Sequence, residues 1–94
     1  MEQNDRIKRA QERIEEAINR CDKLSKRERE VLETICLFGS GKETADALYI
    51  SELTLKSHLR NIQGKLYLDR TTQAVYAYTL WKNRQDSQPD QQSY

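Results

Sequence analysis

The sequence predicts an all-α protein that forms one small domain. In its 94 residues, apolar side chains recur mostly at intervals of three and four, which is the spacing of one helix face. The only proline is Pro89, so no obligate helix breaker interrupts the first 88 residues. No segment shows the sustained alternation of apolar and polar residues that is typical of a half-buried strand.

The first expected helix runs from about residue 3 to residue 22, and residues 1–23 form an amphipathic segment ahead of the domain. Its apolar stripe consists of Ile7, Ala10, Ile14, Ala17, Cys21 and Leu24, spaced 3, 4, 3, 4 and 3. This is the a/d pattern of a coiled coil over fewer than three heptads. Two interpretations stay open. Either the stripe, from Ile7 to Cys21, pairs with a second chain, or it folds back onto its own domain.

A second helix is expected after Ser25, because Ser25 and Glu28, three residues on, form a capping box. Its apolar face consists of Val31, Leu32, Ile35 and Cys36, so we expect Cys36 in the core. The glycines Gly39 and Gly41 predict the loop that ends it. A short third helix over about residues 42–49 is expected to bury Ala45 and Leu48.

The fourth expected helix begins after Ser51 as its N-cap and runs to about residue 66. Its inward positions are Leu55, Leu59, Ile62 and Leu66. A fifth helix over about residues 72–83 is expected to be capped by Thr71 or Thr72. Residues 84–94 are polar and are expected to be a disordered tail, so the folded domain is placed at residues 24–83.

Composition excludes several classes of protein. The 16 Lys and Arg residues nearly cancel the 15 Asp and Glu residues, so no global basic field indicates nucleic acid. No apolar run is long enough to span a membrane, and the N-terminus is too polar for a signal peptide. Cys21, Cys36 and a single His58 predict neither a disulfide framework nor a zinc site. We therefore expect a cytoplasmic, reduced protein with no metal, no cofactor, no membrane association and no enzymatic activity.

The ionisable residues of the fourth helix are nearly all basic. Residues 53–67 contain Lys56, His58, Arg60 and Lys65 but no acidic residue. The outward positions are Lys56, Ser57, Arg60, Asn61 and Gln63. These side chains are donors suited to base edges and phosphates, on a cylinder that fits the major groove of DNA. The residues alone also allow a plain solvated helix face.

Five blocks of sequence carry a resemblance to a known family. They are LSKREREVL at 24–32, SGKETA at 40–45, ISELTLKSHLRNI at 50–62, KL at 65–66 and TQAV at 72–75. In this order they resemble the LuxR-type, GerE-like, DNA-binding domain of bacterial transcription regulators. The resemblance implies a four-helix helix-turn-helix domain whose third helix, the fourth of this chain, enters the major groove. Here an additional helix precedes that domain.

The resemblance also implies roles for single residues. Lys56, Ser57 and Arg60 are expected to read bases or adjacent phosphates. Thr54, Asn61, Lys65 and Lys42 are expected to contact the DNA backbone. Glu28 and Glu43 are expected to tie helices together. The full set of implied DNA-binding residues is Lys42, Thr54, Lys56, Ser57, Arg60, Asn61 and Lys65.

The expected function is a sequence-specific DNA-binding regulator that acts as a homodimer. About 23 residues precede the domain, which is too few for a receiver or sensor domain. The resemblance implies the last helix as a second candidate for the dimer contact, through Tyr76 and Leu80, but these residues could instead belong to the core. An alternative is an interaction protein that sequesters another regulator or RNA polymerase, which the net charge near +1 and the acidic Asp46 favour.

Overall fold

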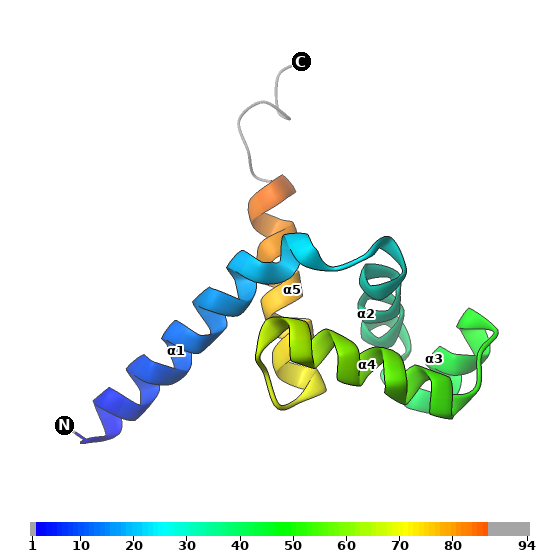
Figure 1. Cartoon of the computed structure of the whole chain (residues 1–94), viewed down its shortest axis with the longest axis horizontal. Helices are drawn as coiled ribbons and strands as arrows, with labels where there is room; N and C mark the ends of the chain where they lie inside the picture. Colours follow the sequence, from blue (N-terminus) through cyan, green and yellow to red (C-terminus); the bar gives the residue numbers. More distant parts are fainter. Residues whose placement is uncertain (1, 87–94) are drawn as a thin grey trace, which may run out of the picture.

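The computed structural model describes residues 2–86, with side chains from residue 4 to residue 85. Within this range five α-helices and one 3₁₀ turn follow one another, and no strand is present (Figure 1). The prediction of an all-α fold is therefore confirmed. The elements are α1 (Glu2–Arg20), η1 (Cys21–Lys23), α2 (Lys26–Phe38), α3 (Gly41–Leu48), α4 (Glu52–Leu66) and α5 (Thr71–Asp86).

Serine side chains begin three of the helices. The Ser25 hydroxyl accepts from the Glu28 amide, and the Glu28 carboxylate accepts from the Ser25 amide at 2.8 Å. The predicted capping box of α2 is thus confirmed. Ser40 and Ser51 accept in the same way from the amides three residues on, at the starts of α3 and α4. Each cap satisfies an N–H group that has no partner within its own helix.

The start of α5 differs from the prediction. The helix begins at Thr71, so neither Thr71 nor Thr72 is its cap. Instead, the Gln73 side-chain oxygen accepts from the amides of Asp69 and Arg70 at 3.3 and 3.2 Å. The helix then continues to Asp86, so residues 84–86 of the predicted tail are helical. The rest of that predicted tail lies outside the described residues.

The core joins all the helices. Val31 and Leu32 of α2 and Ile62 and Leu66 of α4 are fully buried, as predicted, whereas Leu59 is half-buried. The predicted burial of Ala45 and Leu48 in α3 is also confirmed.

Cys36 is exposed, so its predicted place in the core is wrong. Leu37 and Phe38 beside it are exposed as well, because the last turn of α2 extends past the core.

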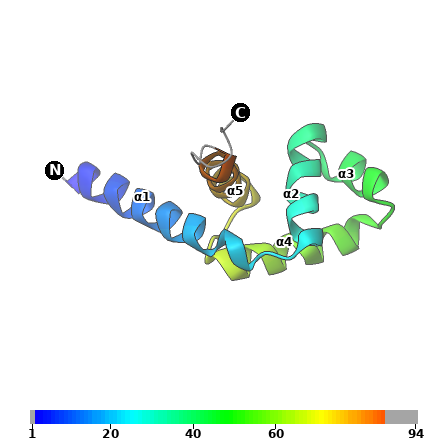
Figure 2. The ribbon, with the colours of Figure 1, turned by 90° about the horizontal axis from the view of Figure 1, so that it is seen from above.

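The helix α1 is divided between two environments. Its second half is part of the core, where Ala17 and Ile18 are buried, together with Cys21 of η1 just beyond it. Its first turns leave the body of the molecule (Figures 1 and 2), and residues 4–13 are exposed. The sequence left open whether Ala17 and Cys21 contact a second chain or their own domain; both are buried in the chain's own core, so their assignment to a dimer contact is wrong. Within residues 2–86 no helix is both long and apolar enough to cross a membrane.

Candidate nucleic-acid interface

The helices α3 and α4 form a helix-turn-helix pair. Tyr49 ends α3 in a left-handed conformation with φ 59°, and only Ile50 and Ser51 separate it from α4. Leu55, Ile62 and Leu66 then anchor one face of α4 in the core. The opposite face of α4 is left open to solvent, which is the arrangement that lets a helix enter a groove.

One ridge of α4 presents the predicted base-reading residues. Lys56, Ser57 and Arg60 are all exposed and follow one another at intervals of one and three residues, so they lie on adjacent positions of one face. The only acidic residue of α4 is Glu52, in its first turn. The ridge is therefore a row of hydrogen-bond donors with no carboxylate among them.

The other predicted DNA-binding residues surround this ridge. Thr54, Asn61 and Lys65 are exposed on α4, and Lys42 is exposed in the first turn of α3. The Thr54 hydroxyl oxygen accepts from the Ser51 hydroxyl at 2.9 Å, so it also supports the cap of α4. All seven predicted DNA-binding residues thus belong to the two helices of this pair.

Lys65 has a structural partner. Its ammonium group donates to Glu28 at 2.7 Å, which connects the end of α4 to the start of α2. Burial alone would raise the pKa of Glu28, but hydrogen bonds from Lys65 and the Ser25 amide outweigh it and lower the pKa. The expected tie between helices is confirmed for Glu28. Glu43 contacts only Ser40 at its own helix start, so the same expectation is wrong for Glu43.

Gln63 does not belong to the open face. Its side chain is half-buried and donates to the Thr71 hydroxyl at 2.9 Å, which fixes the start of α5 against α4. Counting positions along α4 placed Gln63 outward, because the sequence does not reveal that α5 packs beside this position.

Leu53 is a residue of the ridge that the sequence analysis missed. It lies three, four and seven residues before Lys56, Ser57 and Arg60, and 75% of it is exposed. The same helical spacing could have identified it. A large apolar side chain that projects beside a row of donors adds an apolar contact point to the ridge.

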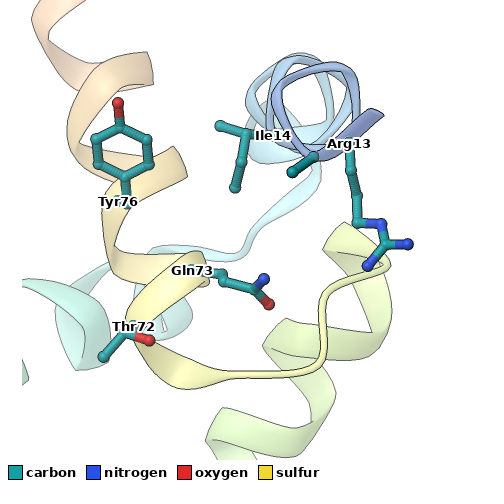
Figure 3. A pocket seen from close by; sticks show the side chains of 6 residues that line it. Arg13, Ile14, Thr72, Gln73 and Tyr76 are labelled. Atoms are coloured by element: carbon teal, nitrogen blue, oxygen red, sulfur yellow. The ribbon is translucent and has the colours of Figure 1, made fainter. Parts of the chain in front are cut away.

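The predicted dimer residues that are exposed or half-buried lie together on a second surface, between α1 and α5. Ile7, Ala10 and Ile14 of α1 face Tyr76 and Leu80 of α5 across one groove. Figure 3 shows Ile14 and Tyr76 on the two sides of the gap between α1 and α5, in an adjoining hollow that Ala10 also lines. The structure therefore brings together residues from the two helices that the sequence named as separate dimer candidates.

The other groups able to do chemistry are structural. The Tyr78 hydroxyl donates to Glu33, which also accepts from Lys82 at 2.8 Å. Burial and Asp22 raise the pKa of Cys21 to about 11, so its thiol stays protonated at neutral pH. In the described part of the chain, no group of three His, Cys, Asp or Glu side chains could hold a metal ion.

Comparison with known proteins finds similarity to bacterial regulatory proteins. Residues 22–77 match the family model described as bacterial regulatory proteins, luxR family. The transcriptional regulatory proteins YhcZ and LiaR of Bacillus subtilis are 47% and 44% identical to the chain over 55 and 61 residues. These matches cover 57% and 61% of this chain but only 26% and 28% of the two relatives, so the chain spans about a quarter of their length.

A shorter relative matches over most of its own length. The spore germination protein GerE of Bacillus subtilis is 44% identical over 52 residues, which is 55% of this chain and 70% of GerE. None of the solved structures matches the chain.

Proposed function

Since the chain belongs to the luxR family of bacterial regulatory proteins, we propose that it regulates transcription by binding double-stranded DNA as a homodimer. Residues 22–77 are a LuxR-type DNA-binding domain. In the proposal α4 lies in the major groove of the DNA, and the protein acts in the bacterial cytoplasm. The observation that carries it is the exposed ridge of α4, which is rich in donors and contains no acid after Glu52.

The ridge suits direct reading of base pairs. Lys56 and Arg60 can donate to the O6 and N7 acceptors of guanine, and the Ser57 hydroxyl can donate or accept. The exposed side chain of Leu53 is suited to the 5-methyl group of thymine. We therefore assign sequence discrimination to these four side chains.

The surrounding polar residues are suited to phosphates. Lys42, Thr54 and Asn61 are exposed on both sides of the α3–α4 turn, where contacts to the DNA backbone would fix the position of α4. Lys65 is proposed as a further phosphate contact, although its ammonium group also holds Glu28. These contacts carry no sequence information and make binding depend on salt concentration.

The test uses the full chain, and the DNA ligand is selected from a random-sequence pool. Lys56→Ala and Arg60→Ala are each expected to weaken binding to the selected DNA by about 5- to 100-fold and to relax the preference at one position. Lys26→Ala, an exposed lysine of α2, is the matched control and should bind like the wild type. Circular dichroism checks that each variant is folded. Unchanged binding by the Lys56/Arg60 double variant would overturn the assignment of α4.

The same selection from random-sequence DNA distinguishes DNA binding from a second candidate function. A net charge of +1 is low for a protein that holds phosphates, which favours an interaction protein that binds another regulator or RNA polymerase. Such a protein would enrich no sequence from the pool. Enrichment of one motif by the wild type, lost in the Lys56/Arg60 double variant, supports DNA binding instead.

A further inference from the structure

The first half of α1 projects from the domain with an unpartnered apolar stripe. Residues 4–13 are exposed, and Ile7 is 57% exposed although it continues the stripe that is buried at Ala17. A helical stretch this short is marginal in water without packing. Its apolar side therefore needs a partner. Within the described residues, no part of this chain buries the stripe on the N-terminal side of Ile14.

A groove runs along this stripe. One wall is formed by Ile7, Ala10 and Ile14, and the other by Tyr76 and Leu80 of α5; the groove is open and has a volume of about 460 Å³. Tyr76 is 57% exposed, so both walls present apolar surface to solvent. Ala10 is the smallest side chain of the α1 wall, which allows a second helix to approach closely at this point.

We propose that this groove receives the first half of α1 from a second copy of the chain, lying antiparallel to the α1 that lines it. The proposal deepens the homodimer of the proposed function and rests on it in that respect. The stripe from Ile7 to Ile14 is narrow enough to fill such a groove. Because each copy offers both the stripe and the groove, the contact is two-fold symmetric and closes as a dimer.

The charges of α1 favour a second copy and set the direction. Residues 5–9 hold three cations and one acid, a net charge of +2, whereas residues 12–16 hold three acids and one cation, a net charge of −2. An antiparallel pair places each positive segment beside the negative segment of the other copy. A parallel pair would instead bring segments of like charge together.

One pair of residues makes this complementarity specific. Lys8 and Glu15 are seven residues apart and so lie on the same side of the stripe, and Glu15 lines the groove. In the antiparallel pair, Lys8 of one copy faces Glu15 of the other, twice by symmetry. Glu15 also accepts from Arg84 of α5 at 2.9 Å, so its carboxylate is already held at the rim of the groove.

The first experiment measures the association state of the full chain without DNA by sedimentation equilibrium across the micromolar range. The wild type is expected to form a dimer, and Ile7→Asp should raise its dissociation constant by at least about 30-fold. The variant should remain folded as a monomer, since Ile7 is not part of the core. A wild type that stays monomeric, or an Ile7→Asp variant that stays dimeric, would overturn the proposal.

The matched control is Leu37→Asp. Leu37 is an exposed apolar residue, 80% accessible, that lies beside the opposite edge of α5, on α2. This variant should dimerise like the wild type. A loss of dimerisation in Leu37→Asp with none in Ile7→Asp would place the interface on the α2–α5 side and reject the groove.

A charge exchange tests the antiparallel direction. Lys8→Glu and Glu15→Lys, each alone, should weaken the dimer by about 5-fold or more, because like charges then face each other. The double variant should bind more tightly than either single variant, since the ion pairs between the two copies are restored in reversed order, although the pair with Arg84 stays broken. Additive losses in the double variant would reject the antiparallel pairing.

The two proposals fail in different ways. Lys56→Ala and Arg60→Ala should lose specific DNA binding while they remain dimeric. Ile7→Asp should become monomeric while it keeps its preference for a single half-site. Failure of the groove as the dimer contact therefore leaves the proposed reading of DNA by α4 intact, and failure of DNA reading by α4 leaves the groove intact.

Discussion

At the level of the single side chain, the α4 ridge combines donors with one apolar group. Leu53 is 75% exposed and stands beside Lys56 and Ser57 on the same face of α4. Thymine is the base that presents a methyl group in the major groove. In the proposed complex, Leu53 would thus favour an A·T pair next to the base pairs that we propose Lys56 and Arg60 read.

Replacing thymine by deoxyuridine in the selected site tests this contact, because only the methyl group is lost. At one position the wild type should bind about 4-fold more weakly, as expected for about 0.8 kcal/mol per buried methyl-sized group. Leu53→Ala should bind both DNAs equally well, whereas Ser57→Ala serves as control and should keep the discrimination. Equal binding of the wild type to every deoxyuridine-substituted site would refute the contact.

At the level of the helices, the pair Glu28–Lys65 links the start of α2 to the end of α4. Glu28 is 7% exposed, and its lowered pKa means that folding favours the ionised form. Its contribution to the free energy of unfolding is therefore fully present above the ordinary value of 4.5 and is lost as the pH falls through the lower pKa of the folded state.

Urea unfolding of the wild type and of Glu28→Gln at several pH values measures this link. At neutral pH the variant should be less stable by about 1–2 kcal/mol, and the difference should shrink as the pH falls below 4.5. Glu12→Gln, at an exposed residue of α1 that makes no ion pair in the described structure, should show a small difference at every pH. A difference for Glu28→Gln that does not change with pH would contradict the role of its charge.

Local signals in the sequence predicted the helices well. Ser25 with Glu28 and Ser51 at its helix start are short-range patterns, and the structure uses both as caps. The inward face of α4 followed from its spacing for the same reason. Thr71 was misjudged because its hydroxyl binds Gln63 of α4, a contact that depends on how two helices pack.

Longer-range features could not be predicted from spacing. Cys36 continues the apolar face of α2, but it lines an open hollow between α2 and α5 and is not part of the core, so its side chain is exposed. The stripe of α1 has the same spacing whether it packs within the chain or against another. The structure distinguishes the two cases by burial, because Ala17 is buried in the chain's own core whereas Ile7 is 57% exposed at an open groove.

For the whole molecule, the position of the charges matters more than their sum. A net charge of +1 conceals a donor-rich ridge on α4 and a helix α1 whose two segments carry opposite charges. The ridge and the α1–α5 groove are built on different helices, and the first turns of α1 point away from α3 (Figure 2). In the proposed dimer, a second copy in the groove would therefore leave both α4 ridges open to engage two half-sites.

This arrangement predicts how binding depends on the spacing of half-sites. The selected DNA should contain two inverted half-sites about one helical turn, 10–10.5 bp, apart, because both α4 helices must reach the same face of the duplex. An insertion of about 5 bp turns one half-site to the opposite face and should weaken binding at least about 10-fold, whereas about 10 bp restores the phase. Ile7→Asp is the matched control: as a monomer it should protect one half-site in a footprint and bind all three spacings equally. If the wild type is as indifferent to spacing as Ile7→Asp, the dimer does not act as a unit on DNA.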